Sequence, residues 1–255
     1  MIKIQNLKKS FGNHQVLKGV DLEIPANKIV FIMGQSGAGK SVLLKHIIGF
    51  MKPDEGEIWF EGKNIVNLSE KELQKIRRKI GYLFQEGALF DSITVAENVA
   101  FPLKEHFKLS QKEIEKKVDE LLKAVNLLEA KYKYPSELSG GMKKRAALAR
   151  TLALNPKIIL FDEPTTGLDP ILQYTILNLI KELKEKFYLT CVIVSHDLHL
   201  ALNFGDFLAF LYQGKIVETG TPKEILHSSH PFVKNFIQTA FLNFTLKEKI
   251  QGGKK

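Results

Sequence analysis

The chain has 255 residues, of which 44% are hydrophobic and 25% charged, and its formal net charge is +9. This length and balance predict one large α/β domain or two tightly packed subdomains. No apolar run approaches the roughly 20 residues that a membrane-spanning helix needs, which argues against a chain that crosses a bilayer by itself.

The positive charge is compatible with nucleic acid, an anionic membrane surface or a lysine-rich solvated exterior. Lysines alternate with acidic residues over positions 112–123, and this pattern favours the solvated exterior. The single cysteine, Cys191, lies in an apolar run and is expected in the core. Residues 1–7 alternate like a strand and show no signal peptide, so we expect the protein in the cytoplasm.

The N-terminal part of the chain reads as strands at residues 2–7, 16–24, 29–33 and 57–60, separated by turn residues. A helix is expected at residues 41–48 and another at 69–78. Ser69 is the expected N-cap of the second helix, with Glu72 at capping-box distance. A strand at residues 80–84 follows.

The middle of the chain, about 87–152, is predicted to be a helical subdomain, because apolar residues recur at helical spacing after Ser110. Strands at 158–161 and 190–194 with a helix at 170–187 between them indicate parallel strands joined by a crossover helix. A hairpin is expected at 207–212 and 215–218, and a short helix after Pro222. Four phenylalanines follow Pro231, and they either complete this chain's core or cover another subunit; they are Phe232, Phe236, Phe241 and Phe244.

Residues 34–41 match the motif G-x-x-x-x-G-K-[ST] in full, between an expected strand and an expected helix. The glycines allow backbone N–H groups to surround phosphate oxygens, Lys40 would reach the β and γ phosphates, and Ser41 would ligate Mg²⁺. A glycine-rich turn before a buried helix is the alternative. The residues expected to bind the nucleotide here are Gly34, Ser36, Gly37, Ala38, Gly39, Lys40, Ser41 and Val42.

A second candidate site is the apolar strand that ends in Asp162 and Glu163. Successive strand residues point to opposite faces, so the two carboxylates are expected to have different roles. Asp162 suits Mg²⁺, and Glu163 suits the polarisation of a water that attacks a phosphoryl group. The alternative is a solvent-exposed acidic turn.

A third motif, Ser139-Gly140-Gly141, precedes a strongly helical run at 146–154. Ser139 is expected to cap this helix, and the glycines permit close approach of a bulky ligand, which makes a second phosphate site plausible. An ordinary capped helix is the alternative.

These motifs and the later His196 occur in the order found in ATP-binding subunits of ABC transporters, which the chain resembles up to about Leu226. The resemblance implies an α/β P-loop ATPase with a mixed core sheet, an N-terminal antiparallel β subdomain and the inserted helical subdomain. It implies an ATPase domain over 1–230 and a C-terminal extension over 231–255. It also implies a head-to-tail homodimer in which Ser139, Gly140 and Gly141 act in trans on ATP bound to the other subunit.

Further residues gain expected roles only from this resemblance. Phe11 resembles the aromatic that stacks on adenine, with Val16 beside it; without the resemblance, Phe11 would be read as a core aromatic. Gln85 resembles the glutamine that touches Mg²⁺ or water and senses a transmembrane partner.

Asp169 resembles the D-loop aspartate that acts in trans, and His196 resembles the switch histidine that contacts the γ-phosphate and holds Glu163. Taken alone, His196 would be read as structural. Met142 is a departure, because most family members have Gln after the Leu-Ser-Gly-Gly run; the Ser and Gly donors remain, so we expect activity to survive.

The loops at 85–92, 97–103 and 137–142 resemble those of the ATPases of Mla-type phospholipid transport systems. This resemblance implies a subunit on the cytoplasmic face of the inner membrane that powers phospholipid transport between inner and outer membranes. Its implied partners are a permease dimer and an MCE-domain lipid-binding protein, with a small accessory subunit as a further candidate.

Two other functions stay open: an importer ATPase for another solute, and a non-transport ATPase acting on nucleic acid. The second is disfavoured, since no second ATPase domain or coiled-coil insertion is visible in the sequence. We therefore expect no nucleic-acid partner.

Overall fold

The computed structural model describes residues 2–252, with side chains up to residue 242. Its strands are β1 (Ile2–Phe11), β2 (His14–Ile24), β3 (Ile29–Met33), β4 (Glu55–Phe60), β5 (Lys63–Asn64), β6 (Ile80–Leu83), β7 (Ile158–Asp162), β8 (Thr190–Ser195), β9 (Phe207–Tyr212) and β10 (Lys215–Gly220). Its α-helices are α1 (Lys40–Ile47), α2 (Glu70–Arg77), α3 (Val95–His106), α4 (Gln111–Ala124), α5 (Gly140–Leu152), α6 (Pro170–Phe187), α7 (Leu198–Phe204), α8 (Pro222–Leu226) and α9 (Pro231–Gly252).

The strands form two sheets. The larger has the order β10-β9-β3-β8-β7-β6, and its strands are parallel apart from the β9–β10 hairpin. The smaller, β2-β1-β4-β5, is antiparallel. The mixed core sheet and the antiparallel N-terminal sheet confirm the expected fold class.

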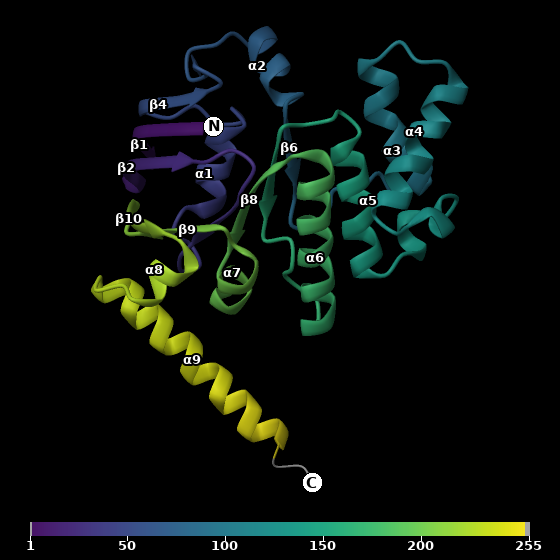
Figure 1. Ribbon diagram of the computed structural model, residues 1–255. Helices are drawn as coiled ribbons and strands as arrows, with labels where there is room; N and C mark the ends of the chain where they lie inside the picture. The colour runs from purple at the N-terminus through teal and green to yellow at the C-terminus, as the bar shows by residue number, and fades with distance from the viewer. Residues whose placement is uncertain (1, 253–255) are drawn as a thin grey trace.

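The larger sheet separates two hydrophobic clusters. Alternating residues of β3 show this, since Phe31 belongs to the cluster on the side of α5 and α6, whereas Val30 and Ile32 belong to the cluster on the side of α1 and the antiparallel sheet. Figure 1 shows helices α3, α4 and α5 on one side of the molecule and the antiparallel sheet on the other. Because a parallel sheet is covered on both faces, its strands are continuous apolar runs.

Most element boundaries agree with the sequence-based expectation. The capping box of Ser69 and Glu72 forms at α2, and α6 covers the expected residues. Ser139 caps α5 as expected, by accepting a hydrogen bond from the Met142 N–H, and the helix therefore begins at Gly140. The two-residue strand β5 pairs with the end of β4 and is an addition to the expected strands.

The C-terminal apolar segment is the helix α9, which extends away from the body of the molecule (Figure 1). Its first turns pack on the protein's own core: the ring of Phe232 stacks on Tyr212 at 3.9 Å, and Phe236 is partly buried. Phe241 is 42% exposed, and the side chain of Phe244 lies outside the described residues. None of the helices in the described range is long and apolar enough to cross a membrane.

Candidate functional site

The candidate functional residues follow four neighbouring parallel strands, which are β3, β8, β7 and β6. Met33 of β3 pairs with Ser195 of β8, and Val194 of β8 pairs with Asp162 of β7. Parallel strands end at the same edge of a sheet, where ligands bind in folds of this type. The loop after β3, the residue after β8 and the end of β7 therefore meet at one edge.

The glycine-rich loop at residues 34–41 closes tightly against the strands beside it. A Cβ added to Gly34 would collide with the backbone oxygen of Leu211 in β9, so only glycine fits there. Gly39 has φ 97° and precedes α1, and a Cβ there would lie 2.8 Å from the side chain of Val16 in β2. The loop thus presents the N-terminal end of α1, with Val16 directly beside it.

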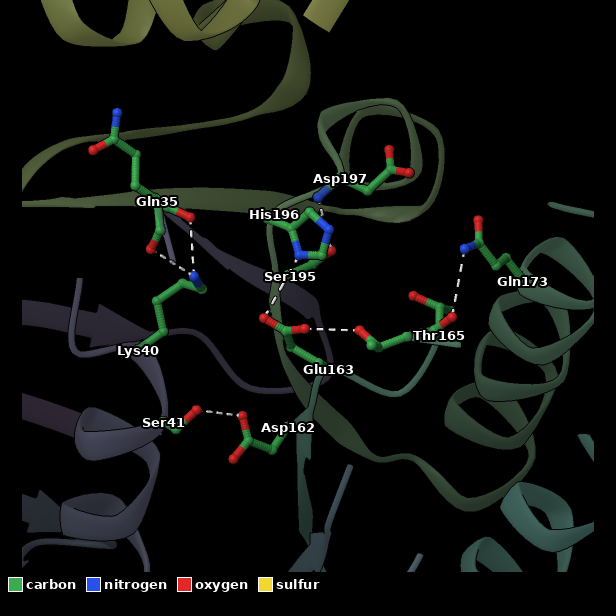
Figure 2. A network of polar contacts seen from close by, with 12 residues as sticks. Gln35, Lys40, Ser41, Asp162, Glu163, Thr165, Gln173, Ser195, His196 and Asp197 are labelled. Atoms are coloured by element: carbon green, nitrogen blue, oxygen red, sulfur yellow. Dashed lines mark hydrogen bonds and ion pairs between the residues drawn. The ribbon is translucent and has the colours of Figure 1, made fainter. Parts of the chain in front are cut away.

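Lys40 lies inside this loop. Its Nζ donates to the backbone oxygens of Gly34 and Gln35, both at 2.9 Å (Figure 2), and the residue is 5% exposed. Burial lowers the pKa of Lys40, whereas the charges of Glu163 and Asp162 raise it. The carboxylates of Asp162, at the end of β7, and of Glu163, directly after it, therefore oppose the effect of burial and favour the charged form of Lys40.

Ser41 and Asp162 form the candidate metal site. The Ser41 hydroxyl donates to Oδ1 of Asp162 at 2.6 Å, and the Tyr82 hydroxyl donates to Oδ2 at 2.8 Å. Hydroxyl and carboxylate oxygens are hard donors that suit Mg²⁺ shared with phosphates. Among the described residues, no group of three or more His, Cys, Asp or Glu could hold a metal by itself. The donor set fits Mg²⁺ that is completed by nucleotide phosphates and water.

Glu163 directly follows Asp162 at the end of β7, and its carboxylate has different partners. Its Oε2 accepts a hydrogen bond from the Thr166 hydroxyl at 2.7 Å, and its Oε1 lies 3.6 Å from Nδ1 of His196. The backbone of Glu163 has φ 49°, a conformation that few residues other than glycine adopt and that is common at active sites. Figure 2 shows Glu163 between His196 and the loop that continues toward Gln173.

His196 is exposed, with 63% of its side chain accessible, and faces the carboxylate of Glu163. The arrangement can hold a carboxylate beside a bound phosphate while the imidazole restrains it from the other side.

The Ser139-Gly140-Gly141 motif lies at the start of α5, next to the D-loop residues. A Cβ on Gly140 would lie 3.6 Å from the side chain of Leu168, and one on Gly141 would lie 3.6 Å from Leu172. Asp169 caps α6 by accepting from the Leu172 N–H at 3.0 Å. The buried residues of α5 belong to the hydrophobic cluster on one face of the larger sheet, and those of α1 belong to the cluster on the other face.

Two predicted residues stand at the margins of the site. Gln85 is exposed after β6, and its backbone oxygen accepts a hydrogen bond from Lys144 of α5. Phe11 is 46% exposed at the end of β1, with Nζ of Lys9 5.7 Å from its ring centroid. The alternative reading of Phe11 as a core aromatic is therefore wrong.

Sequence reasoning missed three residues that hold the site. Tyr82 binds Asp162, Thr166 binds Glu163, and Gln173 of α6 donates to the backbone oxygens of Thr165 and Leu168 at 3.4 and 3.1 Å. Tyr82 lies in the predicted strand β6, but only the order of strands in the sheet shows that β6 is next to β7 and Asp162.

Comparison with protein families places residues 17–166 within the family described as ABC transporter. The chain is 44% identical over 238 residues to the intermembrane phospholipid transport system ATP-binding protein MlaF of Haemophilus influenzae, an alignment that covers 93% of this chain and 90% of that protein. It is also 44% identical to the methionine import ATP-binding protein MetN of Carboxydothermus hydrogenoformans, over 94% of this chain and 72% of that protein.

Solved structures agree with this assignment of the fold. The ATP-binding cassette MJ0796, solved as a dimer in a post-hydrolysis state bound to ADP and Pi, matches with a TM-score of 0.79 and 38% identity, over 87% of this chain and 99% of that chain. The structure of cbiO1 from Clostridium perfringens, part of an ABC transporter complex, matches with a TM-score of 0.83 and 31% identity, over 96% of this chain and 98% of that chain.

Proposed function

Because the chain belongs to the ABC transporter family, where it is an ATP-binding subunit that couples ATP hydrolysis to transport, we propose that it powers phospholipid transport between inner and outer membranes. The observation that supports phospholipid as the cargo is the similarity to MlaF proteins over most of both chains. The cytoplasmic face of the inner membrane is the proposed location.

We propose that each strand end has its own part in hydrolysis. The backbone N–H groups of the loop at 34–41 and the Lys40 ammonium bind the phosphates, and Ser41 and Asp162 hold Mg²⁺. When bound, Mg²⁺ neutralises the charge that develops on the phosphate oxygens. Glu163 orients the attacking water and accepts its proton, while His196 restrains the carboxylate.

The second half of the proposed site comes from another copy of the chain. The position of α5 and α1 on opposite faces of the larger sheet supports this arrangement, as does the dimeric state of the similar MJ0796 cassette. Backbone N–H groups at the start of α5 would face the γ-phosphate of the partner's ATP, and Asp169 would lie at the same interface. ATP then acts as the bridge that closes the homodimer.

A groove near Gln85 supports the proposed permease partner. The groove has a volume of about 330 Å³ and its walls are aromatic and apolar. Arg77, Arg78 and Arg150 also line it; Arg77 is paired with Glu70, so Arg78 and Arg150 add the positive charge. A short helix that carries apolar residues and a carboxylate would fit both features. Its aromatic residues are Phe50, Tyr82, Phe84, Phe90 and Phe101.

The loop that follows β6, beside this groove, is hydrogen-bonded to α5, the helix that begins at the Ser139-Gly140-Gly141 motif. Arg150 of α5 donates to the backbone oxygens of Gly87 and Ala88 at 3.0 and 2.8 Å, and Lys144 donates to that of Gln85. A shift of the loop by a docked permease would therefore be transmitted to α5.

The remaining proposed partners concern the membrane system and the C-terminal extension. An MCE-domain lipid-binding protein would exchange phospholipid with the permease. In the extension, Phe241 and Leu242 are 42% and 64% exposed on α9, and they are candidates for contact with the sister subunit or a small accessory subunit. We propose the domain boundaries 1–230 and 231–255, with the helical subdomain at 87–152, and no role in nucleic-acid binding.

The experiment is to purify the tagged protein from native membranes in mild detergent and identify the proteins and lipids that accompany it. Co-purification of a permease, an MCE-domain protein and phospholipid is the expected result. A solute-binding protein for an amino acid or another small molecule, as the similarity to MetN also allows, would refute the phospholipid proposal but not ATP hydrolysis.

A further inference from the structure

Tyr82 touches both the candidate metal site and the aromatic groove. It lies in β6, next to β7, and its hydroxyl donates to Oδ2 of Asp162 at 2.8 Å. The Ser41 hydroxyl donates to Oδ1 of the same carboxylate at 2.6 Å. Hydroxyls from two different elements therefore hold the two oxygens of Asp162.

The ring of Tyr82 belongs to the wall of the groove. Its centroid lies 4.5 Å from that of Phe84 and 5.9 Å from that of Phe50. Phe84 and Phe50 are 40% and 50% exposed, whereas Tyr82 is half-buried. A single side chain thus spans the distance between the groove and the carboxylate.

The hydroxyl of Tyr82 is the donor in its hydrogen bond with Asp162, because the carboxylate oxygen can only accept. Groups that hydrogen-bond to a metal-ligating carboxylate orient it, and their loss weakens metal affinity by about 10- to 100-fold.

We propose that Tyr82 is a positioning residue that orients Asp162 for the divalent cation and connects that carboxylate to the aromatic groove. This inference rests on the proposed function in assigning Mg²⁺ to Asp162 and a permease helix to the groove. An occupant of the groove that moves Phe84 would shift the Tyr82 ring and change the fit of Asp162 to the cation. By reciprocity, binding of the cation with ATP would change the affinity of the groove for its occupant.

The test measures metal binding without turnover, in the Glu163→Gln variant of the full-length protein. Mn²⁺ replaces Mg²⁺ as a paramagnetic probe, and its binding to the ATP-bound protein is followed by electron paramagnetic resonance. Tyr82→Phe keeps the ring but removes the hydroxyl, and it is expected to weaken Mn²⁺ binding about tenfold. ATP affinity in the presence of a chelator should not change, because the phosphate loop is untouched.

The matched control is Tyr212→Phe, which removes a hydroxyl that accepts from Gln213 at 3.1 Å; Tyr212 lies in β9, which is separated from β7 by β3 and β8. It is expected to bind Mn²⁺ like the parent. Equal Mn²⁺ affinity in the parent and in Tyr82→Phe would overturn the positioning role. If Asp162→Asn in the same background also binds Mn²⁺ like the parent, the proposed metal site itself is wrong, and the two failures are thereby distinguished.

A second pair of variants tests whether the groove is connected to Asp162 through Tyr82. Phe84→Ala removes a ring that contacts Tyr82, whereas Phe101→Ala removes a groove ring that packs on Phe90 at 5.1 Å. Phe84→Ala is expected to weaken Mn²⁺ binding about threefold and Phe101→Ala to leave it unchanged. Equal effects of the two substitutions would refute the connection between groove and carboxylate.

Discussion

Replacement of Glu163 by glutamine separates the proton-accepting role of this side chain from its shape. The amide has the same length as the carboxylate, and its oxygen can still accept the hydrogen bond that the Thr166 hydroxyl donates at 2.7 Å. The side chain should therefore stay in place, whereas its ability to take a proton from water is lost. Binding of ATP should persist, because the phosphate loop and Lys40 are unchanged.

The expected loss of hydrolysis rate in Glu163→Gln follows from the role of Glu163 as general base. Loss of a general base lowers the rate by about 10²- to 10⁴-fold, which corresponds to about 2.7 to 5.4 kcal/mol of transition-state stabilisation. Since the contact between Glu163 and His196 is longer, at 3.6 Å, and His196 is largely exposed, substitution of His196 should cost less than substitution of Glu163.

The assay combines steady-state phosphate release with the size of the protein in the presence of ATP. Glu163→Gln should release phosphate at least a hundredfold more slowly, about the lower limit for a lost base, and should accumulate as an ATP-bound dimer. The control Glu185→Gln makes the same chemical change on an exposed residue of α6 and should behave as wild type. A Glu163→Gln rate within threefold of wild type, roughly 0.7 kcal/mol, would refute the assignment of the base.

Four further predictions concern the loop and the core. Lys40→Ala should lower ATP affinity more than about tenfold in equilibrium titrations, because it removes the charge inside the loop; unchanged affinity would contradict the phosphate site. Gly34→Ala should abolish ATP binding and lower the unfolding midpoint, since a Cβ would strike the Leu211 backbone; normal binding would contradict the tight loop. Burial raises the pKa of Cys191 to about 12, so iodoacetamide should label the native protein far more slowly than the urea-denatured protein. Burial lowers the pKa of His46 in the folded state, so the unfolded state binds a proton at this residue first as the pH falls through about 6.5. The urea midpoint of the wild type should therefore fall more on acidification than that of His46→Gln, and an equal fall of both midpoints would refute this.

Local signals account for the parts of the fold that the sequence predicts well. The capping box at Ser69, the continuous apolar strands of the parallel sheet and the crossover helix α6 depend on residues close together in the chain. The phosphate loop is likewise encoded in eight consecutive residues between a strand and a helix. These features need no knowledge of distant neighbours.

The contacts that hold the site depend on tertiary neighbours and were not predictable. Tyr82 meets Asp162 only because β6 pairs with β7, in register Ile80 with Ile158, across a long insertion. Thr166 donates to Glu163, whose backbone has a positive φ, and no sequence pattern predicts that conformation for a glutamate. The C-terminal phenylalanines were ambiguous because amphipathic spacing does not say which surface a helix covers.

The central claim is that each ATP site is built from two copies of the chain, and mixing two inactive variants tests it most directly. Lys40→Ala disables the phosphate loop. Gly140→Asp places a carboxylate at the second phosphate motif, where the chain's own fold tolerates a Cβ 3.6 Å from Leu168. In mixed dimers one site combines an intact loop with an intact motif, so hydrolysis should recover to about a quarter of wild type after random pairing. A mixture of Lys40→Ala with the Lys40→Ala, Gly140→Asp double variant should remain inactive, and failure of the first mixture to recover activity would contradict the composite site.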